Sequence, residues 1–477
     1  MLIPLIVACA LFMENLDSTA LSTALPAIAA SLGEKPVTLS LAITSYLFSL
    51  AVFIPISGWV ADRYGARQVF RLAIAVFVVG SILCGFSTSI WQLVCARTLQ
   101  GMGGAMMVPV GRLVLLRSVA KPDLVRAMAW LTMPAMVGPM LGPPLGGFIT
   151  TYVDWRWIFW INVPVGVLGI TLVSLFIPNL REERPPRLDL LGFLLSAVGL
   201  LGLVFGFETV GRGLVPLSTA LLLLAVGIAG IALYVLHAAR TPHPVIDLAL
   251  LGVPTFRASI LGGFLFRIGI GAMPFLLPLM LQEGFGLSAF NSGMLTFAAA
   301  AGAMAMKLTA APILKRFGFK RVLIVNALVG AAFIALNGLF EPSTPHLMIL
   351  AVLLVGGFFR SLQFTGVNTL AYADIEREQM SRATSFASMM QQLSLSVGVG
   401  SGALLLHVVV EARGGEHLAA DDFAPAFFTV ALVAALSALA YVRLSPDAGA
   451  EVSGRTPLIA KRTGSEDLKL SPPGPGS

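Results

Sequence analysis

The chain has 477 residues, of which 57% are hydrophobic and 12% are charged, and its mean hydropathy is +0.88. Soluble domains carry about a quarter charged residues, so this composition excludes a soluble globular protein. The formal charge of +7 comes from Lys and Arg residues scattered through short connections, without a basic stripe and interleaved aromatic residues, which excludes a nucleic-acid-binding surface.

Apolar runs of about 20 residues, the length that spans a hydrocarbon core of roughly 30 Å, recur along the whole chain. Loops, Gly/Pro breaks and charges divide them into predicted spans near 3–25, 40–61, 73–89, 91–114, 127–150, 157–177, 189–208 and 216–237. Six more are predicted near 258–282, 290–313, 322–340, 347–371, 383–408 and 425–442. We therefore expect an all-α membrane protein with 14 transmembrane helices. The acids Glu14 and Asp17 interrupt the first run, which favours a retained helix over a signal peptide.

The distribution of Lys and Arg predicts the orientation of these spans. Loops and tail on the side of the two termini carry 22 of the 31 basic residues, the opposite loops carry 4, and the spans carry the remaining 5. Basic residues accumulate on the cytoplasmic side of membrane proteins. We expect a multi-pass protein of the bacterial inner membrane with both termini in the cytoplasm. The polar segment 444–477 is predicted to be a disordered cytoplasmic tail.

Two short sequences occur twice in the same order. GWVADRYGARQVF (58–70), after the second span, aligns with APILKRFGFKRVL (311–323), after the tenth, and Arg97-Thr-Leu-Gln100 corresponds to Arg360-Ser-Leu-Gln363. This indicates a duplicated six-helix unit. We predict an N-terminal six-helix bundle over 1–180, a linker with an inserted two-helix hairpin over 181–250, and a C-terminal six-helix bundle over 251–443.

Four motifs resemble those of the major facilitator superfamily, and within it the fourteen-helix drug:proton antiporters. They are LDSTALSTALP (16–26) in the first span, Gly58-x-x-x-Asp62-Arg63-x-Gly65-x-Arg67, Arg97-x-x-Gln100-Gly101-x-Gly103-Gly104, and Gly138-x-x-x-Gly142-Pro143-x-x-Gly146-Gly147. The segments GGAMMVPVGR and WRWIFWINVPVG further resemble the MdtD and HsrA group of multidrug exporters. The resemblance covers about residues 1–443 and implies two helical bundles that expose a central cavity alternately to each side.

The resemblance also implies roles for the loop motif and for the fifth-span motif. Gly58, Asp62, Arg63, Gly65 and Arg67 would control conformational gating by tying the two halves together, as opposed to being only solvated topology determinants. Asp62 is expected near the start of the span at 383, where a helix N-terminus favours a carboxylate, and Asp123 is a candidate partner for Arg67.

The glycines of the fifth span recur every four residues and form a stripe without side chains. The predicted antiporter-motif residues are Gly138, Pro139, Gly142, Pro143, Gly146 and Gly147. Such a stripe lets another helix approach closely, and the prolines bend the helix. We expect a kinked seal against the inserted side of the bundle, with generic small-residue packing as the alternative.

Glu14 and Asp17 are the acids that lie deep in the predicted spans, and their spacing places them on one helical face. A low-dielectric cavity and a neighbouring acid both favour the protonated form of a carboxyl group, so this pair is predicted to couple transport to protons, with Asp17 favoured by the family motif. The resemblance implies that Arg97 tunes the acid or takes part in proton transfer, and Gln100, one turn further along the helix, is a candidate member of the same network. The alternative is that Asp17 forms a structural ion pair and never titrates.

The spans contain more cations than acids, which indicates the charge of the cargo. The predicted substrate-cavity residues are Gln100, Arg112, Arg267, Lys307, Arg360, Gln363 and Gln392. Unpaired intramembrane cations favour an anionic or zwitterionic cargo. The alternative is that Lys307 and Arg112 extend to the interface and the others bind carbonyl groups.

The sequence therefore predicts a proton-coupled exporter of small amphipathic compounds. The alternatives are an exporter of an organic anion or a metal chelate such as iron citrate, and an importer with the same fold. An ATP-driven pump is excluded because a Walker A loop needs a Gly-Lys dipeptide, which the chain lacks, and scattered His and Cys residues disfavour an enzyme. We expect no cofactor and no metal, a monomer in the lipid bilayer, and as partners the small-molecule substrate and protons.

Overall fold

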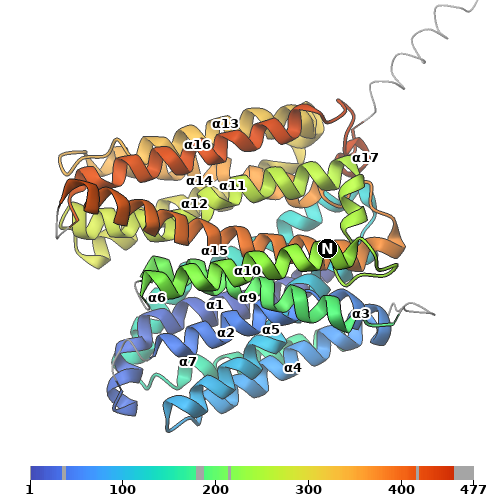
Figure 1. Cartoon of the computed structure of the whole chain (residues 1–477), viewed down its shortest axis with the longest axis horizontal. Helices are drawn as coiled ribbons and strands as arrows, with labels where there is room; N and C mark the ends of the chain where they lie inside the picture. The colour runs from blue at the N-terminus through green and yellow to red at the C-terminus, as the bar shows by residue number, and fades with distance from the viewer. Residues whose placement is uncertain (1, 35–38, 179–186, 213–215, 415–417, 456–477) are drawn as a thin grey trace, which may run out of the picture.

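The computed structural model describes residues 2–34, 39–178, 187–212, 216–414 and 418–455, and every regular element in these ranges is helical (Figure 1). The first eight helices are α1 (Leu2–Leu32), α2 (Ser40–Phe53), α3 (Ser57–Tyr64), α4 (Ala66–Gly85), α5 (Ile90–Ser118), α6 (Leu124–Tyr152), α7 (Trp157–Trp160) and α8 (Asn162–Phe176). They are followed by α9 (Leu190–Arg212) and α10 (Leu217–Ala238). The last seven are α11 (Pro254–Leu279), α12 (Ala289–Phe317), α13 (Phe319–Asn337), α14 (His346–Leu370), α15 (Met380–Arg413), α16 (Phe423–Val442) and α17 (Ala450–Ser453).

The 14 predicted spans are all present as helices in the described ranges. Thirteen are long and apolar enough to cross a membrane, and the fourteenth consists of α2 and α3, which are bent by 61° against one another. The bend lies at Pro55, whose ring has no N–H to donate and clashes with the preceding turn. The prediction of an all-α protein with 14 membrane helices is confirmed.

The long helices run side by side and pack in two groups. In the N-terminal group (α1–α8), α1 packs along α6, and α4 along α5; in the C-terminal group (α11–α16), α12 packs along α14, α11 along α15, and α13 along α16. Helices α9 and α10 form a hairpin along one side of the two groups, where α9 contacts both α2 and α15 and α10 packs on α9 (Figure 1). We interpret this packing as the two six-helix bundles and the inserted hairpin of the sequence prediction.

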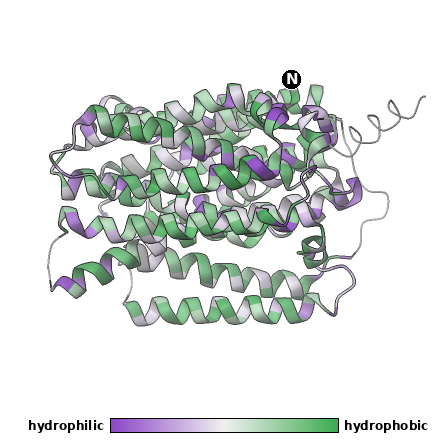
Figure 2. Cartoon of the chain, turned by 90° about the horizontal axis from the view of Figure 1, so that it is seen from above, coloured by the Kyte–Doolittle hydropathy of each residue, from purple (hydrophilic) through white to green (hydrophobic). Residues whose placement is uncertain are grey.

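Apolar residues cover the lengths of the helices, and hydrophilic residues gather mainly towards their two ends (Figure 2). This is the distribution that a hydrocarbon layer requires, because charged groups are costly away from its surfaces. We call the end at which α1 begins and α16 ends the terminal end. The α3–α4 and α12–α13 connections also lie at this end.

The two repeated loops have the same backbone conformation. Gly65 joins α3 to α4 with φ of 91°, and Gly318 joins α12 to α13 with φ of 76°. Positive φ is accessible to glycine without a steric cost, which explains why both loops keep a glycine at this point. The alignment of these loops in the sequence thus corresponds to a structural equivalence.

The predicted disordered tail is wrong for its first part. Residues 444–455 are folded at the terminal end, where Leu444 and Val452 are buried. Gly449 lies against Phe319, and Glu451 pairs with Lys121 at 3.1 Å. The apolar residues in this polar segment were too few for its folding to be recognised from the sequence. The rest of the predicted tail, 456–477, lies outside the described residues.

Candidate functional site

Asp17, in the middle of α1, is buried and held by donors from three other positions. Arg97 of α5 donates from Nη1 to Oδ2 at 2.6 Å, while Gln100 Nε2 and Asn162 Nδ2 donate to Oδ1 at 3.0 and 2.7 Å. The side chains of Asp17 and Arg97 are 0% and 1% exposed. The predicted partnership of the first-span acid with Arg97 is therefore present, as a fully buried ion pair.

Arg97 has further partners that hold its guanidinium in place. Nε donates to the carbonyl of Ala42 at 3.3 Å, Nη1 donates to Gln100 Oε1 at 2.6 Å, and the guanidinium carbon lies 4.4 Å from the centre of the Tyr46 ring. Gln100 also donates to Ser81 at 2.7 Å. A buried charge is tolerated when its hydrogen-bonding capacity is satisfied in this way.

Glu14 lies one turn before Asp17 in a different environment. It is 8% exposed, and Tyr46 Oη donates to its Oε1 at 3.1 Å. The other carboxyl oxygen, Oε2, is buried and has no hydrogen-bond partner. Gly104 of α5 makes room for this contact, because a Cβ at that position would lie 2.7 Å from Tyr46 Oη. We call Glu14, Asp17, Tyr46, Arg97, Gln100 and Asn162 the acid cluster.

Three of these positions correct or extend the sequence prediction. Gln100 was predicted to line the substrate cavity, but it is 0% exposed and bonded within the acid cluster. Tyr46 and Asn162 were not predicted. In the sequence, Asn162 stands out as a polar residue in an apolar segment. That observation alone does not show which helix its side chain faces.

The second predicted site, the gating motif, lies at the terminal end and joins the two groups of helices. Asp62 of α3 accepts a hydrogen bond from Ser381 in the first turn of α15, and the hydroxyl groups of Ser57 and Ser385 lie 2.8 Å apart. Gly58 packs directly on α15, where a Cβ would lie 2.6 Å from the Ser381 carbonyl oxygen. We call Ser57, Gly58, Asp62, Ser381 and Ser385 the terminal gate. The structure places Asp62 at the start of the span near 383, as predicted from the sequence.

Other residues of the motif have partners that differ from the prediction. Asp62 forms an ion pair with Arg117 of α5 at 3.1 Å, which the sequence analysis did not foresee. Arg67 donates to the carbonyl of Ile177 at 3.4 Å, whereas Asp123 is exposed and forms no ion pair with it. The prediction that Asp123 pairs with Arg67 is therefore wrong. Arg63 is exposed at the end of α3.

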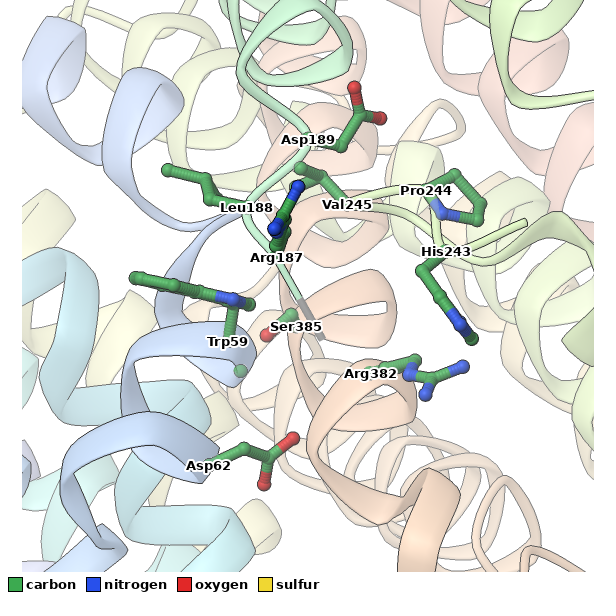
Figure 3. A pocket seen from close by; sticks show the side chains of 11 residues that line it. Trp59, Asp62, Arg187, Leu188, Asp189, His243, Pro244, Val245, Arg382 and Ser385 are labelled. Carbon is green, nitrogen blue, oxygen red and sulfur yellow. The ribbon is translucent and has the colours of Figure 1, made fainter. Parts of the chain in front are cut away.

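The segments that lead into and out of the inserted hairpin cover the terminal gate (Figure 3). Arg187 and His243, one from each segment, line a pocket with Trp59, Asp62 and Ser385 (Figure 3). Two contacts hold these segments in place. Asp247 forms an ion pair with Arg382 of α15 at 3.0 Å, and Asp189 Oδ1 is hydrogen-bonded to the His237 ring of α10 at 2.8 Å.

Two predicted substrate residues, Arg112 of α5 and Arg267 of α11, are buried and bonded to residues of the C-terminal group. Arg112 donates to Tyr372 Oη at 3.2 Å and to Gln391 Oε1 at 3.3 Å, and Arg267 of α11 donates to Asn368 Oδ1 at 3.2 Å. The two arginines are 6% and 4% exposed. Arg267 Nε is buried without a partner. Neither arginine forms an ion pair with an acid among the described residues.

The remaining predicted substrate residues are dispersed within the C-terminal group. Lys307 of α12 is buried and donates to Thr365 at 2.7 Å. Arg360 is half-buried and lines a pocket between α11, α12, α13 and α14, with no hydrogen bond or ion pair to a described residue. Gln363 is 0% exposed and bonded to Asn326, so its assignment to the substrate cavity is wrong. Gln392 is half-buried on α15.

The glycine stripe of α6 packs against α1. A Cβ at Gly138 would lie 3.0 Å from Asn15 and Leu16, and one at Gly142 would overlap Thr19. The expected seal against the inserted side of the bundle is therefore wrong, because the stripe faces the helix that carries the acid cluster. Gly147 has open space at its Cβ position; Pro139 is exposed and Gly146 buried. The Pro143 side chain lies outside the described residues.

Comparisons with known proteins bear directly on this arrangement. The family model of the Major Facilitator Superfamily matches residues 7–238 and 259–472. A protein of Citrobacter koseri, provisionally named multidrug resistance protein MdtD, is 40% identical over 450 residues, which are 93% of this chain and 94% of that protein. The protein of the same name from Escherichia coli K12 is 39% identical over the same shares.

Solved structures share the fold at low sequence identity. The human organic anion transporter MFSD10 (TETRAN) superposes with a TM-score of 0.66 at 16% identity, covering 92% of this chain and 99% of that one. The proton:xylose symporter XylE superposes with a TM-score of 0.64 at 15% identity, covering 92% and 94%. Since a family model and close relatives match nearly its whole length, this multi-pass membrane protein belongs to the major facilitator superfamily of transporters.

Proposed function

We propose that the chain is a proton-coupled antiporter that exports small amphipathic compounds from the cytoplasm across the bacterial inner membrane. The observation that carries this proposal is the acid cluster, where an unpaired carboxyl oxygen of Glu14 is buried beside the Asp17–Arg97 ion pair. Ionisable groups at this depth are expensive and mark ion or proton pathways. The names of the MdtD relatives support multidrug compounds as cargo.

The sidedness follows from the basic residues of the terminal end. Because cytoplasmic loops carry an excess of Lys and Arg, the terminal end is assigned to the cytoplasm. Its gate is closed across α3 and α15, so the conformation is closed towards the cytoplasm. In the transport cycle, protonation from outside would allow this gate to open, and cargo binding from the cytoplasm would release the proton.

Transport into inverted membrane vesicles tests the proposal. In such vesicles the cytoplasmic face is outside, so a lumen made acidic should drive uptake of a fluorescent amphipathic dye, and collapsing the pH gradient with an ionophore should stop it. A matched control is the variant Glu34→Gln, which removes a carboxyl group outside the acid cluster. Uptake that ignores the pH gradient would overturn antiport, and efflux of cargo driven by the same gradient would establish an importer.

A second candidate cargo is an organic anion or an anionic metal chelate such as iron citrate. The specific observation is the pair Arg112 and Arg267, two buried cations without an acid, one of which keeps an unpaired N–H. An anion between them would neutralise both charges and link the two groups of helices. A neighbour in fold is itself an organic anion transporter.

Ligand-induced thermal stabilisation separates the two cargo classes. If the cargo is anionic, citrate should stabilise the purified protein, and Arg267→Gln should abolish that effect while Arg257→Gln, at an exposed position of the same helix, preserves it. Stabilisation by cationic dyes with no response to citrate would exclude the anionic cargo.

A further inference from the structure

We infer that Glu14 is the residue that carries the exchanged proton, and that Asp17 serves as the counter-ion of Arg97. This inference rests on the proposed proton coupling and reverses the preference for Asp17 that the family motif suggested. It follows from the hydrogen bonds that each carboxyl group makes. It also limits this cluster to one exchangeable proton.

Asp17 is engaged as the ion-pair partner of Arg97. Both of its oxygens accept hydrogen bonds, Oδ2 from Arg97 and Oδ1 from Gln100 and Asn162, and all three partner atoms are N–H donors in these contacts. Neutralising Asp17 would leave Arg97 as an uncompensated buried charge. The contacts therefore assign Asp17 the role of counter-ion.

Glu14 has the opposite arrangement. Only Oε1 has a partner, the hydroxyl of Tyr46, and Oε2 is buried without one. A bare carboxylate oxygen away from water loses its hydration without compensation, and a protonated oxygen loses much less. Glu14 can thus exist in both forms, with the protonated form favoured when the site is closed to water.

The charged and titratable groups around Glu14 support this assignment. Asp17 lies on the same helix, Tyr46 on α2 and Arg97 on α5, and the charge of Asp17 opposes a second negative charge at Glu14. Helix α6, which packs along α1, contributes Arg126 and Tyr152, but these lie near its two ends and are exposed. Helices α7 and α8 contain no titratable side chain.

The proton step is a transfer between Glu14 Oε2 and water. The carboxylic acid and a water molecule give the carboxylate and a hydronium ion, and the reverse reaction reloads the site. The charge of the acid cluster changes from zero to minus one, because Asp17 and Arg97 cancel in both states. A cationic group of the cargo would be attracted by the deprotonated cluster, so release of this proton would favour binding of a cationic amphipathic molecule.

Tyr46 is a positioning residue in this scheme. Its hydroxyl donates to the Glu14 carboxylate, and its ring faces the Arg97 guanidinium. The variant Tyr46→Phe removes the donor and keeps the ring. Proton release from Glu14 should then require a higher pH, because the carboxylate loses its only hydrogen bond.

Infrared difference spectroscopy of the full-length protein in lipid tests the assignment. Between acidic and alkaline buffer, the wild type should show loss of one protonated carboxyl band, and Glu14→Gln should abolish this band while Glu34→Gln retains it. The variant Tyr46→Phe should shift the midpoint of the band upward in pH. A double variant, Asp17→Asn with Arg97→Gln, removes the ion pair as a neutral unit and should retain the band.

Each outcome has a defined meaning. A band that persists in Glu14→Gln and disappears in the double variant would overturn the inference and make Asp17 the proton carrier. If the wild type shows no titrating buried carboxyl group but still transports cargo, proton coupling itself fails. If the double variant does not fold, the wild-type, Glu14→Gln and Tyr46→Phe spectra still decide the assignment.

Discussion

Replacing Asp62 by asparagine should shift the conformational equilibrium towards an open terminal gate. The carboxylate accepts a hydrogen bond from Ser381 across the gate, and it faces the N-terminus of α15. A hydrogen bond to a charged group is about 1 kcal/mol stronger than a neutral one, and a helix dipole adds roughly 0.5–1 kcal/mol. The total of about 1.5–2 kcal/mol corresponds to a change of about 13- to 30-fold in the ratio of closed to open molecules.

Spin-label distance measurements provide the assay for this change. Labels at Arg71 of α4 and Arg321 of α13 report the separation of the two groups at the terminal end, and both positions are exposed. The matched control is Asp123→Asn, which removes an exposed carboxylate that has no gate contact. A distance distribution in Asp62→Asn that equals that of the control would refute the view that this carboxylate holds the gate closed.

Three further predictions concern packing, the hairpin and the acid cluster. Gly142→Val should lower the thermal unfolding temperature in detergent and the free energy of unfolding by about 1–3 kcal/mol, because the valine side chain would overlap α1. Gly147→Val should have no such effect, since there is open space at that position. Equal effects of the two variants would contradict the close approach of α6 to α1. A double-mutant cycle of Arg382→Gln and Asp247→Asn should give a coupling of only about 0.2–1 kcal/mol, measured by thermal unfolding, because the pair is partly exposed. Asn162→Leu should remove about 1.5–3 kcal/mol from the stability of the ionised acid cluster and lower proton-driven transport; unchanged transport would exclude a role for this amide.

Much of the fold could be predicted from the sequence because it depends on local properties. The length of each apolar run determines whether a helix can cross the bilayer, and the basic residues mark the ends of the helices. The two glycine-linked loops at Gly65 and Gly318 were recognisable because positive φ restricts the residue type. The bend at Pro55 was not predicted, although its cause is the local chemistry of proline. The folded segment 444–455 was not predicted, since it depends on contacts with the rest of the bundle.

The candidate site was predicted only in part, because its contacts cross between helices that are far apart in the sequence. The partnership of Asp17 and Arg97 could be anticipated because buried charges need counter-ions. The donors Tyr46 and Asn162 depend on how α2 and α8 are rotated about their axes, which apolar periodicity does not determine in helices that are hydrophobic on all sides. The same uncertainty led to the wrong partner for Arg67.

Protonation of the acid cluster and closure of the terminal gate are linked in the proposed transport cycle. The distance between labels at Arg71 and Arg321, measured over a range of pH in the wild type and in Glu14→Gln, tests this link. We expect a distance distribution that changes with pH in the wild type and is independent of pH in the variant. A variant that keeps the full pH response, or a wild type that has none, would contradict it.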